Sequence, residues 1–361
     1  MANICIVCKE EFFFATQTSG KGRCKCIKDF WASDIPEQIS LLPTIRLLAE
    51  NGNTSAMANL VGAQRHLDQQ QDVYQEWVFK AAELGDLHAV AEYIDEFLIG
   101  EIDGIHSEEQ SSLFAKYCKL LDDKGLGEGD FFRFEYLDLI DEWEKSQDFL
   151  VKSANMGNKS ALEKVFVDDY FELNLSQMEK IVRENLKEGR WLAASYFAGY
   201  LEESDPDSAK AWYEIAITLA GKKDKAEISR VLGDFCWRIK DYPRAISAFE
   251  KHIELTEDLE KISTKTLNNL GFSATEVNDL DKAEKYWAIS ASRNNSIAIN
   301  SLGWLAEKRG LISAAQLWWE RTAKDDDLYA IRGLIRVKLI ANDSAGAEFW
   351  ESRLKEIQKE E

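Results

Sequence analysis

Small and apolar residues of this chain recur in a pattern that is typical of paired helices. Three segments share the order Ala-x-x-Gly-[Asn/Asp]-x-x-Ala, at residues 49–56, 82–89 and 154–161. A glycine at the end of a helix takes the left-handed conformation that stops it, and a following Asn or Asp can cap the next helix. We therefore predict that each segment joins two antiparallel helices, which its alanines allow to approach closely.

A second pattern occupies the C-terminal part of the chain. An alanine stands three or four residues before an aromatic residue at Ala209, Ala245, Ala283, Ala315 and Ala347, and the last four alanines are 38, 32 and 32 residues apart. A Leu-Gly pair comes thirteen residues before three of these alanines, and its glycines are Gly233, Gly271 and Gly303. The unit fits two helices of about 13 residues, with the glycine of the first letting the second pack against it.

These motifs resemble known helical repeats. Residues 226–350 resemble the tetratricopeptide repeat, and residues 40–170, with Trp-x-x-Lys-Ala-Ala-x-x-Gly-[Asn/Asp] at residues 77–86, resemble the Sel-one-like variant. The resemblance implies an all-α fold, a right-handed superhelical solenoid of antiparallel helix pairs, because one hairpin cannot bury its own apolar face. The sequence departs from the repeat pattern at Leu334-Ile335, where Leu-Gly is expected, and the expected proline after the second helix is absent.

Four regions follow from these patterns. We predict a cysteine-rich element at residues 1–32, N-terminal helical repeats at 33–96, an irregular helical connection at 97–135 and a C-terminal repeat array at 136–361. The connection is predicted because residues 97–135 fit the repeat pattern badly and contain five glycines. A connection of this kind weakens or bends the array.

In the families that this chain resembles, the first helix of each pair lines a concave inner surface. The resemblance assigns the following residues to that surface: Arg230, Asp234, Trp237, Asn268, Phe272, Asn300, Trp304 and Arg332. Asparagine, arginine and aromatic side chains on one face suit a groove for an extended or helical peptide. The alternative for any single tryptophan is that it packs between hairpins, where large rings usually lie.

Charge and composition narrow the functional classes. The chain has 64 acidic and 44 basic side chains, a formal net charge of −20, so it would repel a phosphate backbone. We predict a protein or peptide partner of basic character and no nucleic acid.

No stretch approaches the ~20 apolar residues that span a bilayer, and the first residues lack a secretion signal. We therefore expect no membrane insertion and a cytoplasmic location.

The N-terminal cysteines are the one candidate for site chemistry. Cys5-x-x-Cys8 is followed after fifteen residues by Cys24-x-Cys26, and two loops that each present a pair of thiolates can bind zinc tetrahedrally. We predict a small zinc-ribbon-like element with one structural Zn²⁺ per chain, because a segment of about 30 residues otherwise has too little core to fold. A redox-active dithiol and unligated cysteines are the alternatives.

Other motifs give no support for catalysis. The four histidines are scattered without metal-site or nucleophile spacing, residues 122–130 have Lys124 and Leu126 where a calcium loop needs oxygen ligands, and no nucleotide-binding glycine motif occurs. We therefore predict a non-catalytic scaffold that binds a basic partner on an acidic concave face. One alternative is an immunity or inhibitor protein that neutralises a basic toxin or nuclease, and another is a redox or metal sensor that acts through the N-terminal cysteines.

Overall fold

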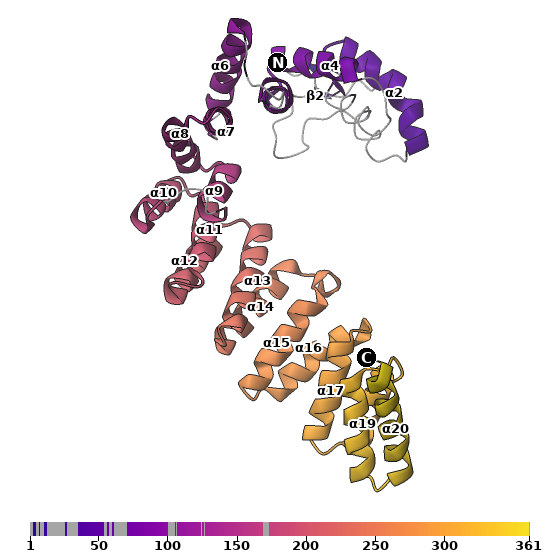
Figure 1. The fold of residues 1–361 in the computed structure, drawn as a ribbon. Coiled ribbons are helices and arrows are strands. Elements are labelled where there is room, and N and C mark those ends of the chain that lie inside the picture. Colours follow the sequence, from indigo (N-terminus) through magenta and orange to yellow (C-terminus); the bar gives the residue numbers. More distant parts are fainter. Residues whose placement is uncertain are drawn as a thin grey trace. The chain divides into compact units, whose positions relative to one another are not determined.

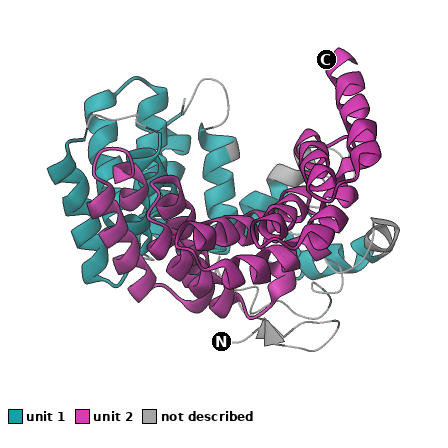
Figure 2. Ribbon diagram, turned by 90° about the horizontal axis from the view of Figure 1, so that it is seen from below, with its two compact units in different colours: residues 1–196 teal, residues 197–361 magenta. Residues whose placement is uncertain are grey.

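The chain forms two compact units of helices. The computed structural model describes residues 3–4, 7, 11–12, 26, 35–53, 56–57, 60, 71–99, 105, 107–123, 125, 127–168 and 173–360. Unit 1 comprises Met1–Tyr196 and unit 2 comprises Phe197–Glu361, and Figure 2 colours them separately. The division falls inside one helix, α11 (Leu192–Leu201).

Unit 1 begins with a short strand pair and continues as helices (Figure 1). Strands β1 (Asn3–Ile4) and β2 (Glu11–Phe12) pair antiparallel, with Asn3 opposite Phe12. The helices that follow are α2 (Ile35–Glu50), α4 (Gln71–Glu83), α5 (Leu87–Tyr93), the π-helix η1 (Ile94–Ile99), α6 (Glu108–Asp122), α7 (Glu128–Leu139), α8 (Trp143–Asn155), α9 (Lys159–Phe166) and α10 (Leu175–Lys187).

The predicted joints at residues 82–89 and 154–161 connect α4 to α5 and α8 to α9, as expected, and the described part of the joint at 49–56 has the same glycine conformation and side-chain cap. Gly52, Gly85 and Gly157 have φ of 81°, 82° and 85°, the left-handed conformation that an L side chain rarely adopts. The next residue in each joint has a side-chain oxygen that accepts a hydrogen bond from a backbone N–H two or three residues ahead, and in this way Asp86 caps α5 and Asn158 caps α9. Ala56, Ala89 and Ala161 are buried where the helices meet.

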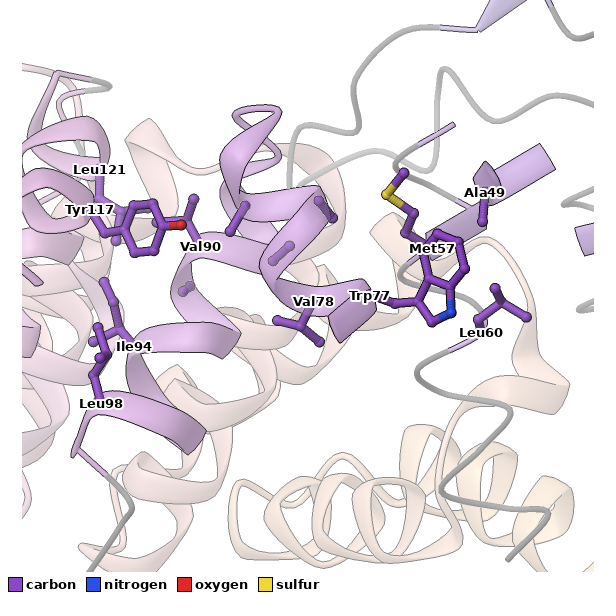
Figure 3. Packing of buried hydrophobic residues seen from close by; sticks show 14 of the residues in the cluster. Ala49, Met57, Leu60, Trp77, Val78, Val90, Ile94, Leu98, Tyr117 and Leu121 are labelled. Carbon is purple, nitrogen blue, oxygen red and sulfur yellow. The ribbon is translucent and has the colours of Figure 1, made fainter. Parts of the chain in front are cut away.

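An apolar core holds the first helices of unit 1 together (Figure 3). Trp77 on α4 lies beside Met57 and Leu60, and further along the core Tyr117 and Leu121 of α6 are packed with side chains of α5 and η1. Tyr117 is completely buried, and its hydroxyl donates a hydrogen bond to the Glu83 carboxylate at 2.7 Å. This hydrogen bond ties α6 to α4.

Two regular helices occupy much of the stretch predicted as an irregular connection. α6 and α7 meet at Gly129, where an added Cβ atom would lie within 3 Å of the backbone oxygen of Cys118. Gly127 precedes α7 with φ of 68°, and its carbonyl accepts a hydrogen bond from the Ser153 hydroxyl at 2.6 Å. The glycines that obscure the repeat pattern therefore permit a tight turn and a close approach of backbones.

Charged side chains tie these helices together. The buried carboxylate of Asp130 on α7 accepts hydrogen bonds from Arg133 at 2.8 Å and from Lys152 of α8 at 2.9 Å. Arg133 also donates to Asp122 at the end of α6 at 2.6 Å. A buried carboxylate requires such pairing, because an unpaired charge in the interior is strongly unfavourable.

Unit 2 consists of helices that follow one another as hairpins (Figure 1). After the end of α11 come α12 (Pro206–Leu219), α13 (Lys222–Arg238), α14 (Tyr242–Thr256), the short 3₁₀ turn η2 (Leu259–Lys261), α15 (Thr264–Glu276), α16 (Leu280–Ser292), α17 (Ser296–Lys308), α18 (Ile312–Ala323), α19 (Leu328–Ile340) and α20 (Ser344–Glu360). The bounds of α15 to α19 agree with the predicted helices of about 13 residues.

The glycine of each predicted Leu-Gly pair faces the aromatic ring of its partner helix. A Cβ atom at Gly233, Gly271 or Gly303 would lie within 3 Å of the ring of Phe249, Trp287 or Trp319, respectively. The prediction that this glycine lets the second helix pack against the first is confirmed. All three rings are almost fully buried, so the contact is the central packing feature of each hairpin.

The described residues contain no helix that is both long and apolar enough to cross a membrane.

Candidate partner-binding surfaces

Two of the predicted surface residues, Arg230 and Asp234, form the start of a polar network between first helices of unit 2. Arg230 on α13 donates a hydrogen bond to Asp234 at 2.9 Å, and Asn269 on α15 donates to the other oxygen of Asp234 at 3.1 Å. Arg230 also binds Glu227 at 2.6 Å. The hydrogen bond between Glu227 and Arg230 lowers the pKa of the carboxyl and raises the pKa of the guanidinium, so both stay ionised.

An aromatic group adjoins this network. The ring of Phe272 on α15 lies edge-on to Trp237 of α13, with centroids 6.2 Å apart, and to Tyr242 at the start of α14, with centroids 6.0 Å apart. Phe272 nevertheless keeps 42% of its surface exposed. We name these six residues the α13–α15 cluster: Arg230, Asp234, Trp237, Tyr242, Asn269 and Phe272.

The two predicted asparagines lie inside the array instead. The Asn268 side chain donates a hydrogen bond to Asn295 at 2.9 Å, and the Asn300 side chain donates to Asp327 at 3.1 Å. Asn295 and Asp327 are the residues that cap α17 and α19. Both asparagines are only 8% exposed, so each fastens one first helix to the start of the next and neither presents its amide to a partner.

The remaining two predicted residues are separated from the α13–α15 cluster. Trp304 on α17 packs partly against the buried cluster around Trp319, and its ring lies edge-on to Trp287 with centroids 6.4 Å apart. The ammonium of Lys308 covers the Trp304 ring at 4.9 Å. Arg332 on α19 is exposed. Of the eight predicted residues, the structure thus brings together Arg230, Asp234, Trp237 and Phe272.

The predicted zinc ligands fall mostly outside the described residues. Cys5, Cys8 and Cys24 lie outside them, and Cys26 is partly buried and packs against the core of unit 1. The zinc site, with its one Zn²⁺ per chain, stays a prediction.

A cavity in unit 1 was not anticipated from the sequence. It has a volume of about 720 Å³ and is lined by residues of α4, α5, η1 and α6. We name it the aromatic groove, after Phe79, Tyr93 and Phe97 in its lining. Three glutamates and one lysine also line it: Glu76, Glu83, Glu109 and Lys116.

A smaller cavity of about 440 Å³ in unit 1 contains a carboxyl that titrates near neutral pH. Burial, and secondarily the charge of Asp95, raises the pKa of Glu135 to about 7. In the same lining, the Tyr196 hydroxyl donates a hydrogen bond to Glu163. A raised pKa does not by itself identify a reaction, because structural interactions also shift pKa values.

Comparisons with known proteins give fold-level similarity only. No family model and no curated protein matches the sequence. Among solved structures, the chain is similar to PilF of Pseudomonas aeruginosa (16% identity, 59% of this chain and 99% of that chain covered, TM-score 0.39). It is also similar to a protective antigen of uropathogenic Escherichia coli with an SLR fold (18% identity, 88% of this chain and 71% of that chain covered, TM-score 0.38). A third similar structure is a Sel1 repeat protein from Oxalobacter formigenes (17% identity, 76% of this chain and 84% of that chain covered, TM-score 0.35). Because these TM-scores are below 0.5, we take the function from this chain's own residues.

Proposed function

We propose that this protein is a non-catalytic scaffold that binds a basic protein or peptide, and that the α13–α15 cluster of unit 2 is its main contact surface. The observation that carries the proposal is Phe272, an exposed ring held in place by two other aromatic rings beside a polar network. Aromatic and arginine side chains at the centre of an interface commonly provide most of the binding free energy.

The arrangement favours binding with little rearrangement. Asp234 is fixed by hydrogen bonds from Arg230 and Asn269, so its carboxylate is already oriented before a partner arrives. A surface that is ordered in advance loses less conformational entropy on binding. The net charge of −20 supports a basic partner, since complementary charge speeds association and disfavours acidic competitors.

A peptide array with basic, neutral and acidic sequences tests this function. We expect the full chain to bind basic peptides preferentially, and the Phe272→Ala variant to bind the tightest of them roughly 10-fold more weakly, as for loss of an aromatic interface anchor. Leu317→Ala, which shortens a side chain with 67% exposure on α18, is the matched control and is expected to leave affinity unchanged. Equal affinity of Phe272→Ala and the unaltered protein, or a preference for acidic peptides, would contradict the proposal.

A structural zinc ion at Cys5, Cys8, Cys24 and Cys26 belongs to the same proposal. Its support is the spacing of these cysteines. Elemental analysis of the purified full chain is expected to give about one zinc per chain, and a chelator is expected to destabilise the N-terminal segment. A metal-free protein of unchanged stability would contradict the zinc site, and loss of a redox activity from folded Cys5→Ser would favour the redox alternative.

A further inference from the structure

We propose that the aromatic groove of unit 1 is a second binding site, which takes an arginine side chain from an extended segment of a basic partner protein. Its lining residues all belong to unit 1, whereas the α13–α15 cluster belongs to unit 2. The inference therefore goes beyond the proposed function, and each of the two sites can fail without the other.

The aromatic side chains form a continuous ladder. The centroids of Phe79 and Tyr93 are 5.4 Å apart, and those of Tyr93 and Phe97 are also 5.4 Å apart. Phe79 is 38% exposed, so the ladder opens to solvent at α4. A guanidinium group is planar and weakly hydrated and stacks readily on aromatic faces, which makes arginine better suited to such a ladder than lysine.

The charges around the ladder favour a cation. Three carboxylates line the groove against one ammonium, that of Lys116. Hydrogen bonds to Glu83 from Lys116 and from the Tyr117 hydroxyl lower the pKa of this carboxyl, so it remains ionised. Glu76 pairs with Lys80 at 2.6 Å, and Glu109 is exposed in the first turn of α6. Glu109 is therefore the carboxylate best placed to pair with an incoming guanidinium.

Size and local geometry agree with this occupant. A volume of about 720 Å³ lies within the usual range of ligand sites, so the groove has room for an arginine side chain together with part of the peptide that carries it. The ladder residue Phe97 lies on η1, which continues α5 as a π-helix. Such departures from α-helical geometry are frequent at functional sites.

Calorimetric titration of the full chain with short glycine-serine peptides tests the proposal. One peptide carries two arginines, the second carries citrulline at those positions and the third carries lysine. We expect the arginine peptide to bind, and the citrulline and lysine peptides to bind measurably more weakly. Phe79→Ala is expected to weaken arginine-peptide binding roughly 5-fold to 30-fold, and Glu109→Gln is expected to weaken it by a smaller factor.

Two matched variants separate this site from the rest of the molecule. Leu84→Ala shortens a side chain with 50% exposure just beyond α4 and outside the groove lining, and it is expected to leave binding unchanged. Because Phe272 belongs to the proposed contact surface of unit 2, the second comparison is made in a Phe272→Ala background, where Phe79→Ala is expected to weaken arginine-peptide binding by the same factor as in the unaltered protein. Absence of arginine-peptide binding, equal binding of the citrulline or lysine peptide, or loss of binding in Phe272→Ala but not in Phe79→Ala would overturn the proposal.

Discussion

Replacement of Gly129 by alanine is expected to lower the free energy of unfolding by roughly 3 kcal/mol, at the upper end of the usual cost of overpacking. The added methyl group would lie within 3 Å of the Cys118 carbonyl oxygen and of the Asp122 carboxylate. The first of these belongs to the backbone of α6, so it cannot rotate away as a side chain can. Either α6 and α7 separate, which weakens the ion pair between Arg133 of α7 and Asp122 of α6, or the turn before α7 distorts.

Urea-induced unfolding followed by circular dichroism measures this effect. The matched control is Gly199→Ala, because Gly199 is also a helical glycine but its added Cβ would be 3.6 Å from the Tyr213 hydroxyl, an ordinary contact distance. The control is expected to be stabilised by up to about 1 kcal/mol, the intrinsic helix preference of alanine over glycine. An equal urea midpoint for Gly129→Ala and the unaltered protein would show that the two backbones have room to move apart.

The features that the sequence predicts well are those decided by neighbouring residues. The left-handed glycine and the capping Asn or Asp of each unit 1 joint depend on two consecutive residues, such as Gly85 and Asp86. The contact between Gly271 and Trp287 depends on two helices of one hairpin, whose register the repeat spacing already fixes. Local conformation and the repeat period were therefore sufficient to predict the helix joints and the contacts within a hairpin.

Side-chain partners in the next hairpin could not be read in the same way. Periodicity places Asn268 and Asn300 on the first helix of a pair, but it does not show that each amide reaches the capping residue of a later helix. The separation is 27 residues in both cases, from Asn268 to Asn295 and from Asn300 to Asp327, and this repeated spacing is the signal that could have indicated a structural role.

The aromatic groove was missed for a related reason. The spacing of Tyr93 and Phe97 places both on one helix face, but Phe79 joins them only after α4 packs against α5. The glycines between α6 and α7 also interrupt the repeat pattern, so residues 97–135 were predicted as an irregular connection although they contain α6 and most of α7. A sequence pattern averaged over one repeat is insensitive to a site that takes residues from three successive helices.

Replacement of Trp319 by alanine is expected to cost about 3–5 kcal/mol, the usual range for removal of a large buried aromatic side chain. Trp319 is completely buried, and an added Cβ at Gly303 of α17 or at Gly333 of α19 would lie within 3 Å of its ring. The ring thus packs between the first helices of two successive hairpins. Its indole N–H has no hydrogen-bond partner in the described structure, so packing accounts for the stabilisation.

The close contact between Gly333 and the Trp319 ring allows a second test of this packing. Gly333→Ala alone is expected to destabilise the protein by about 1–3 kcal/mol, because the methyl group meets the Trp319 ring. In a Trp319→Ala background the same substitution is expected to stabilise it by up to about 1 kcal/mol, since the clash is gone and alanine favours the helix. A urea double-mutant cycle measures this reversal of sign. Additive effects of the two substitutions would contradict direct packing of Trp319 on α19, because residues in contact are the ones whose substitutions couple.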